Sequence, residues 1–172
     1  MYDEQRRLAD RQTALYEVLR AVSAHLDPAA IAEAAVQAVS RWTGWPAVTL
    51  LLPDETGAYL TVQAAAGILS AAAGWRLAST QGVTGRAFRT ARTQLVPDVG
   101  AAPDYVAGAA GVRSEMAVPL LSHQRVLGVL NVESDRPAAF QSEDVLWAES
   151  LAEAIALAMT NARRATELSI LN

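Results

Sequence analysis

Two pairs of strand-forming segments, each joined by a short turn, constrain the fold of this chain most. Residues 47–52 form an apolar run that only Thr49 interrupts, and residues 59–64 alternate in polarity after a Pro-Asp-Glu-Thr-Gly turn. Residues 114–121 and 125–133 form a second pair around a Ser-His-Gln turn. Strands joined by such short turns pair antiparallel. The sequence therefore predicts an antiparallel sheet built around two hairpins.

Short elements are predicted between the two hairpins. Residues 75–77 and 94–96 are expected to form short strands, and Thr84 is expected to cap a short helix that runs to Ala91. Residues 98–111 are rich in Gly, Ala and Pro and are interpreted as a loop or a marginal helix. A long loop inside a compact domain is typical of a binding lid or of a disordered segment.

The segment before the strands is predicted to form two helices. The first covers about residues 2–25, and Asp27 and Pro28 are the expected N-cap and first position of the second. Gly44 and Pro46 end that second helix. Apolar residues of the first helix recur at heptad-like steps, a spacing that favours contact with a partner helix, at Leu8, Leu15, Leu19, Val22 and Leu26.

A long helix is predicted to close the chain. Ser142 is its expected N-cap, and Glu143 and Asp144 fall in its first turn, where the helix dipole favours negative charge. Its apolar residues again have heptad-like spacing, at Trp147, Leu151, Ile155, Ala158, Ala162, Ala165 and Leu168. The order of elements predicts an α+β domain whose helices pack mainly on one face of an antiparallel sheet.

Composition excludes several kinds of chemistry. The 172 residues contain no cysteine and no lysine, which excludes disulfides, thiolate catalysis, zinc–thiolate sites and Schiff bases. A net charge of −4 argues against a nucleic-acid partner. No apolar run approaches the length of about 18 residues that a membrane span needs. We expect a cytoplasmic protein without a metal or cofactor, whose two histidines, His25 and His123, are solvated.

Several sequence blocks resemble the GAF domain family over about residues 28–165. Taken in order, the blocks are Gly-Val-Thr-Gly-Arg-Ala-Phe at 82–88, Val-Pro-Asp-Val at 96–99, Gly-Val-Arg-Ser-Glu-Met-Ala-Val-Pro-Leu at 111–120, Gly-Val-Leu-Asn-Val at 128–132 and Phe-Gln-Ser-Glu-Asp at 140–144. The resemblance implies a six-stranded antiparallel sheet with helices behind it. It also implies a ligand pocket on the opposite face, under the irregular segment.

The resemblance further suggests which residues line that pocket. Arg113 is expected to hold an anionic group, and Trp75 and Tyr105 to flank a planar or apolar body. The full set is Trp75, Val83, Phe88, Tyr105, Arg113, Ser114 and Met116. The alternative for its apolar members is an ordinary place in the core. Residues 82–85 are interpreted as a tight turn before a capped helix, in preference to a phosphate-binding loop.

Known activities of the family are not expected in this chain. Phe140 and Asp144 match part of the cyclic-nucleotide-binding pattern, but Val145 replaces its glutamate and the required lysine is absent. Covalent bilin binding and the reduction of free methionine sulfoxide depend on cysteine in the relatives that perform them. The sequence therefore predicts that the domain is not an enzyme.

The resemblance implies a regulatory sensor domain of a bacterial signal-transduction protein, most often a sensor histidine kinase of a two-component system. Residues 1–27 are expected to form a signalling helix, residues 28–141 the GAF core, and residues 142–172 a helix that leads to an output domain. A homodimer through the terminal helices and an unknown small ligand are the expected partners. The predicted dimer interface comprises Leu8, Leu15, Leu19, Val22, Leu151 and Ile155. The alternatives are a ligand-free dimerisation module and the GAF domain of a nucleotide cyclase or transcription regulator.

Overall fold

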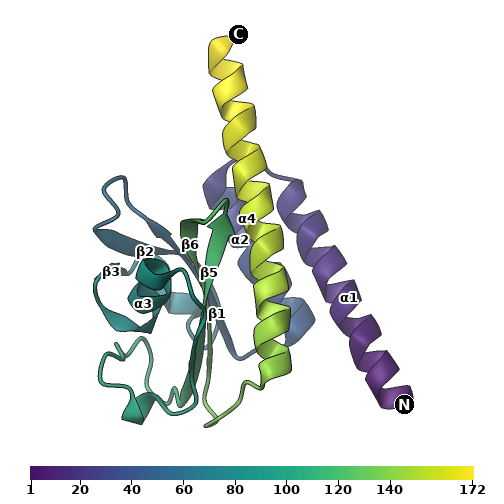
Figure 1. The fold of residues 1–172 in the computed structure, drawn as a ribbon, viewed down its shortest axis with the longest axis vertical. Coiled ribbons are helices and arrows are strands. Elements are labelled where there is room, and N and C mark those ends of the chain that lie inside the picture. Colours follow the sequence, from purple (N-terminus) through teal and green to yellow (C-terminus); the bar gives the residue numbers. More distant parts are fainter.

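The computed structural model describes residues 1–172 and contains one six-stranded antiparallel sheet (Figure 1). The strands lie in the order β3-β2-β1-β6-β5-β4, and all neighbouring pairs are antiparallel. Their bounds are β1 Ala47–Pro53, β2 Tyr59–Gly67, β3 Arg76–Ala78, β4 Gln94–Val96, β5 Ser114–Ser122 and β6 Arg125–Ser134. The predicted α+β fold around a six-stranded antiparallel sheet is confirmed.

Helices cover both faces of the sheet, and the longer ones gather on one face (Figure 1). There α1, α2 and α4 pack together, whereas the short α3 packs on the other face over β4, β5 and β6. The bounds are α1 Tyr2–Ser23, α2 Pro28–Thr43, α3 Gly82–Thr90 and α4 Ser142–Leu171, with 3-10 turns at Ser70–Ala72 and Val99–Ala101. None of the helices combines the length and the hydropathy needed to cross a membrane.

Both ends of α2 follow the predicted chemistry. Asp27 is the N-cap, and its carboxylate accepts a hydrogen bond from the Ala30 amide at 3.3 Å. Pro28 takes the first helical position, where a backbone N–H would have no partner in the helix. Gly44 ends the helix in the left-handed conformation, with a φ of 72° that glycine adopts without steric strain.

The N-caps of α3 and α4 differ from the predictions. Gln141, not Ser142, caps α4. The cap is a capping box in which the Asp144 carboxylate accepts a hydrogen bond from the Gln141 backbone N–H at 2.8 Å. α3 begins at Gly82, so Thr84 lies inside the helix and does not cap it. The reason in α3 is Gly82 itself, because its φ of 74° turns the chain into the helix before Thr84 is reached.

Both faces of the central strands are buried because successive side chains point to opposite sides of the sheet. Leu50, Met116 and Leu130 are fully buried in the core beneath α1, α2 and α4. Leu51 and Val129 belong to smaller apolar clusters on the α3 face. This two-sided burial explains why β1 is apolar at nearly every position.

Three residues of the predicted dimer interface are buried within the domain itself. Val22, Leu151 and Ile155 are fully buried in the core between the helices and the sheet, so they have no surface to offer a second copy. The assignment of these three residues to an interface is therefore corrected. Apolar residues at steps of three and four predict that a helix has a packing partner, but they do not tell whether that partner belongs to the same chain.

The other predicted interface residues lie on the outer side of α1. Leu8 and Leu19 are 58% and 39% exposed, and Leu15 is partly buried at the edge of the core. The helix packs on its own domain through a different stripe, which includes Ala14 and Val18. A dimer through α1 stays a prediction, and within this helix it rests on Leu8 and Leu19.

Side-chain contacts hold α1 against the start of α4. Arg11 pairs with Glu143 at 3.0 Å, and its guanidinium lies 5.6 Å from the centre of the Trp147 ring. Trp147 in turn packs edge-on against Trp45, with ring centres 5.2 Å apart. The two terminal helices are therefore coupled to each other and to the loop that enters β1.

Truncation of a buried residue of α4 tests how the core is assigned. We expect Leu151→Ala to lower the free energy of unfolding by about 2–5 kcal/mol, because it deletes a fully buried side chain. Leu146→Ala on the same helix is the matched control, with a change within about 0.5 kcal/mol, because Leu146 is 68% exposed. Urea titration followed by circular dichroism measures both, and equal losses would contradict the assignment.

Candidate ligand-binding site

A small cavity lies on the α3 face of the sheet. Its volume is about 110 Å³, and its wall includes residues 106–108, the first residues of α3 and side chains of β1, β5 and β6. Pockets for drug-sized ligands measure about 300–1,000 Å³, so this cavity suits a smaller molecule. About half of the wall is apolar, and its polar side chains are Thr49, Arg76, Thr84, Glu115, Asn131 and Glu133.

Two glutamates from neighbouring strands meet at this cavity. Glu115 of β5 is directly opposite Glu133 of β6 in the strand register, so both side chains leave the sheet on the same face. Asn131 shares that face, two residues before Glu133, and is opposite Thr49 of β1. Glu115, Asn131 and Glu133 are 3%, 5% and 4% exposed. The floor of the cavity is therefore a buried polar cluster between otherwise apolar strands.

When both carboxyls are ionised, several atoms of this cluster have no hydrogen-bond partner within the chain. Asn131 Nδ2 donates to Glu133 Oε1 at 3.3 Å, but Glu115 Oε2, Asn131 Oδ1 and Glu133 Oε2 are unpaired. A buried polar group without a partner costs about 1–3 kcal/mol. An ionised carboxylate oxygen and an amide oxygen both accept hydrogen bonds, so a ligand that supplies N–H or O–H donors suits this floor.

The two carboxyls favour a state in which they hold a proton between them. Burial raises the pKa of Glu115 well above its ordinary value, and the negative charge of Glu133 raises it further. Burial also raises the pKa of Glu133, although hydrogen bonds from Glu115 and Asn131 oppose that rise. Like charges in contact disfavour double ionisation. The pair therefore keeps a proton at a pH at which an exposed glutamate has lost its own.

Tyr105 lies close to this pair, in the segment that covers the cavity. Its hydroxyl is buried, and burial together with the charges of Glu133 and Glu115 raises its pKa, although the Gly108 backbone amide opposes the rise, so the hydroxyl stays a hydrogen-bond donor. The preceding residue, Asp104, pairs with Arg86 of α3 at 3.3 Å. This ion pair ties the covering segment to α3.

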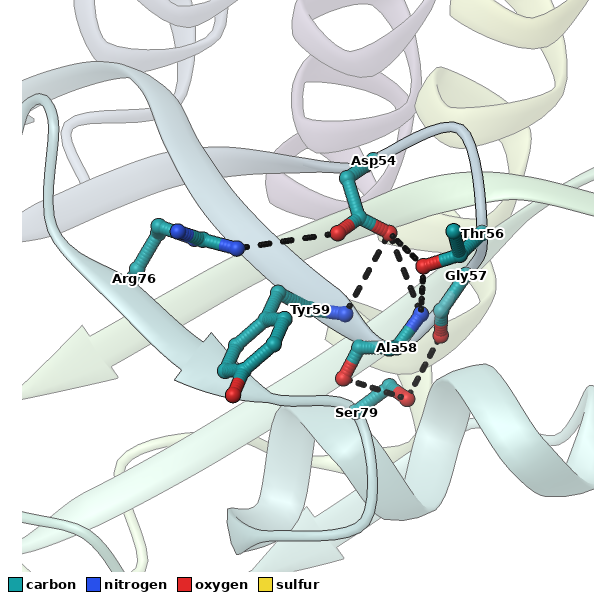
Figure 2. A network of polar contacts seen from close by, with 7 residues as sticks. All are labelled: Asp54, Thr56, Gly57, Ala58, Tyr59, Arg76 and Ser79. Carbon is teal, nitrogen blue, oxygen red and sulfur yellow. Dashed lines mark hydrogen bonds and ion pairs between the residues drawn. The ribbon is translucent and has the colours of Figure 1, made fainter.

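A polar network at the β1–β2 turn fixes an adjacent part of the wall (Figure 2). One carboxylate oxygen of Asp54 accepts a hydrogen bond from the Tyr59 backbone N–H at 3.4 Å, and the other forms an ion pair with Arg76 at 3.6 Å. The Arg76 guanidinium also lies over the Tyr59 ring, 4.1 Å from its centre. Ser79 donates its hydroxyl to the Gly57 carbonyl at 2.7 Å. These contacts hold β3, and the chain that leads from it into α3, against the β1–β2 hairpin.

The structure brings some of the predicted ligand-binding residues to the cavity. Trp75 and Val83 line it, and Tyr105 lies beside the acidic pair. Trp75 is about half exposed, at 51%, so its ring borders the cavity from the outside edge. Phe88 is partly buried and packs against the apolar clusters next to the cavity.

The remaining predicted residues lie elsewhere, and their assignment to the pocket is corrected. Arg113 is exposed and contributes backbone hydrogen bonds beside β5 instead of a side chain in the cavity. Ser114 donates its hydroxyl to the Arg136 carbonyl at 2.6 Å, which fixes the chain after β6. Met116 is buried beneath the helices, on the face opposite to Glu115. The strand alternation therefore sends Glu115, and not its neighbours, into the cavity.

The residues missed from the sequence are Glu115, Asn131 and Glu133. Their signal is present in the sequence, because Glu115 interrupts an apolar strand and Asn131 and Glu133 alternate with Leu130 and Val132. Residues two apart in a strand share a face. Charged residues are rarely fully buried in a strand without a specific partner or function.

Comparison with known proteins finds relatives of this chain. The sequence model of the GAF domain matches residues 25–160. The chain is 35% identical over 69 residues to GAF domain-containing protein A of Dictyostelium discoideum. It is 36% identical over 76 residues to free methionine-R-sulfoxide reductase of Saccharomyces cerevisiae. The matched segments cover 40% and 44% of this chain, and 44% and 42% of those two proteins.

The fold is also similar to a solved enzyme structure. The X-ray structure of free methionine-R-sulfoxide reductase from Neisseria meningitidis in complex with its substrate superposes with a TM-score of 0.82 and 30% sequence identity. The superposition covers 90% of this chain and 91% of that one. The likeness therefore extends over nearly the whole of both chains.

These relatives contradict one prediction. The sequence alone predicts that the domain is not an enzyme, in part because it contains no cysteine. That prediction is wrong, because proteins that the chain resembles in sequence and in fold are reductases. An enzymatic role belongs among the candidate functions.

The buried acidic pair predicts an unusual dependence of stability on pH. Below the ordinary glutamate pKa of 4.5, Glu115 and Glu133 are protonated in both the folded and the unfolded state, so they give stability no dependence on pH. Above it the unfolded chain releases protons that the folded chain keeps, so stability falls, by up to about 1.4 kcal/mol per pH unit for each retained proton. The fall ends once the pH passes the raised pKa of the folded protein.

Urea unfolding of the ligand-free protein between about pH 5 and pH 8 measures this slope. Glu115→Gln is expected to flatten it, because the variant has no carboxyl to deprotonate at that position. Glu55→Gln, a change at an exposed turn residue, is expected to leave the slope as it is. A wild-type slope that survives in Glu115→Gln would contradict the titration of the pair.

Proposed function

Because the chain belongs to the GAF domain family, whose sequence model matches residues 25–160, we propose that it is a sensor domain for a small ammonium-bearing molecule. The observation that carries the proposal is the set of unpaired acceptor atoms on Glu115, Asn131 and Glu133. An ammonium group supplies N–H donors together with positive charge. The donors suit the hydrogen-bond acceptors on the buried floor of the cavity, and the positive charge suits its carboxylates.

Charge favours a cation over the other small molecules that fit by size. The carboxyl pair becomes more acidic when a positive charge lies against it, so it gives up its shared proton as the ligand enters. A purely anionic ligand meets repulsion from Glu115 and Glu133 at the same place. The Neisseria relative supports this choice, because its name gives a free amino acid, which carries an ammonium group, as the substrate.

The structure offers a route from the cavity to the terminal helices. On β5, Glu115 lines the cavity while Met116 and Val118 lie in the core against the helices, and α4 packs on that strand. A ligand that prefers one position of β5 would therefore bias the position of α4. This coupling between ligand and helix is what a sensor requires.

The proposal also covers how the domain dimerises and how it connects to an output domain. We propose that a second copy packs on α1, where Leu8 and Leu19 are exposed, and that α4 leads to an output domain in the same chain. An output domain of the histidine-kinase type suits a cavity that controls the position of α4. The coupling of α1 to α4 through Arg11 and Glu143 supports a joint movement of the two helices.

Catalysis on a free amino-acid sulfoxide is a second candidate function, favoured by the similarity to the two reductases. Reduction of a sulfoxide to a thioether consumes two electrons and two protons and releases water. Because this chain contains no thiol, the proposed electron donor is an external dithiol, which is oxidised to its disulfide. The acidic pair is suited to protonating the sulfoxide oxygen.

Calorimetric titration with ammonium-bearing molecules tests the sensor proposal. Free amino acids, including methionine and both methionine sulfoxide epimers, and simple amines form the set. At least one is expected to bind, and Glu133→Gln is expected to weaken it by about tenfold to 150-fold, the equivalent of about 1.5–3 kcal/mol for a charged hydrogen bond. Glu55→Gln is the control and keeps the wild-type affinity. Failure of every ammonium-bearing molecule to bind would reject the proposal.

Product analysis tests the second candidate. The domain is incubated with free methionine-R-sulfoxide and dithiothreitol, and the methionine formed is quantified. Turnover above the rate without protein, and its loss in Glu115→Gln, are expected of an enzyme that uses the acidic pair as proton donor. A rate equal to the protein-free rate, measured with a protein that binds its ligand, would leave the sensor as the sole candidate of the two.

A further inference from the structure

A groove lies on the helix-covered face of the sheet, beside the part of α4 that leaves the domain. Its volume is about 620 Å³, within the range of about 300–1,000 Å³ that is typical of pockets for drug-sized ligands. Its walls come from the chain just before and at the start of α2, from the β5–β6 turn, and from α4 between positions 159 and 167. Figure 1 shows that α4 continues well past this turn.

The floor of the groove is apolar. Met159 and Ala162 of α4 are 8% and 1% exposed, and Leu127 of β6 is partly buried against the same core. Leu26, which borders the groove ahead of α2, is 65% exposed. A single exposed leucine is common at a protein surface, but here it lies at the edge of a concave apolar surface. An apolar chain in the groove would cover Leu26 and the floor together.

The β5–β6 turn forms one side of the groove and is joined to α4. A hydrogen bond of 3.0 Å connects the hydroxyl groups of Ser122 and Thr160. His123 and Gln124 have φ angles of 50° and 68°, the left-handed conformation that asparagine and glycine usually supply in a two-residue hairpin turn. In this conformation the turn places both His123 and Arg125 along the groove.

The charged residues around the groove leave one positive charge without a partner. They are Arg125, Arg163 and Glu167. Glu167 accepts a hydrogen bond from Arg163 at 3.1 Å, so these two charges balance each other. Arg125 takes part in none of the four ion pairs of the chain. A guanidinium group matches the geometry of a carboxylate, which it can bind through two parallel hydrogen bonds.

We propose that this groove is a second binding site, for a monocarboxylate with an apolar chain. The carboxylate pairs with Arg125, and the chain lies over Leu127, Met159 and Ala162. Each part of such a molecule has its counterpart in the groove, one unmatched cation and one apolar floor. An alkylamine meets the charge of Arg125 with its own positive charge, and inorganic phosphate has no apolar part to cover the floor.

The position of the groove makes its ligand an effector of α4. A molecule in the groove contacts α4, the β5–β6 turn and the chain that enters α2, and so holds α4 to the domain at the point where the helix projects. A ligand that prefers one orientation of α4 shifts the population toward it. The site is separate from the cavity of the acidic pair, which lies on the opposite face of the sheet, and its existence does not depend on the function proposed for that cavity.

Calorimetry with matched eight-carbon ligands tests the proposal on the wild-type protein at neutral pH. Octanoate is expected to bind at least tenfold more tightly than octylamine and more tightly than octanol. Decanoate is expected to bind about tenfold more tightly than octanoate, because it buries two further methylene groups. Failure of both carboxylates to bind, or equal affinities for octanoate and either of the other two eight-carbon ligands, would overturn the proposal.

Substitution of Arg125 tests the carboxylate contact. Arg125→Gln is expected to weaken octanoate by about threefold to tenfold, the range for an ion pair exposed to water, and to leave the affinity for octanol unchanged. Arg92→Gln is the matched control, because it removes an exposed arginine that lies outside the groove, and it is expected to keep the wild-type affinity for octanoate. Equal losses in the two variants would overturn the role of Arg125.

Methionine methyl NMR places the ligand directly. The chain has three methionines, Met1, Met116 and Met159, and only Met159 lines the groove. Octanoate is expected to shift the Met159 methyl signal and to leave that of Met1 in place. Shifts at Val83 and Thr84 without a shift at Met159 would place octanoate in the other cavity and overturn the proposal. A Met159 signal that follows the protein concentration instead of the octanoate concentration would assign the groove to a second copy, with the same consequence.

Discussion

The pairing of β1 with β6 is the interaction on which the rest of the structure depends. It joins the hairpin of β1 and β2 to the hairpin of β5 and β6, with Thr49 opposite Asn131 and Leu50 opposite Leu130. The first of these pairs lines the cavity, and the second lies in the core beneath the long helices. A slip by one residue would exchange the two faces of a strand. The register therefore determines the cavity and the core together.

Most of the fold could be predicted from local patterns. The two hairpins, the strand Gln94–Val96 and the capped start of α2 all follow from turn residues, alternation and capping chemistry acting over a few positions. The partners of the helices could not be predicted in this way. Ile155 and Leu8 both occupy heptad-like positions, yet one is fully buried in the domain and the other is 58% exposed.

The candidate site was less predictable, for a reason of geometry. Family resemblance indicates which segments approach a pocket, but a strand places neighbouring residues on opposite faces. Met116 was therefore a natural choice from its block, whereas its neighbour Glu115 is the residue that lines the cavity. Asn131 and Glu133 become visible only when polar residues inside apolar strands are paired by register.

β5 separates the cavity on one face of the sheet from the helix-covered core on the other face. On one side Glu115 borders the cavity, and on the other Met116 is packed in the core against the helices. A change of volume on the helix side therefore displaces the wall of the cavity without touching any residue that lines it. Substitutions that face the helices can therefore change which ligand the cavity accepts. A screen for altered selectivity should include the helix-facing positions of β5.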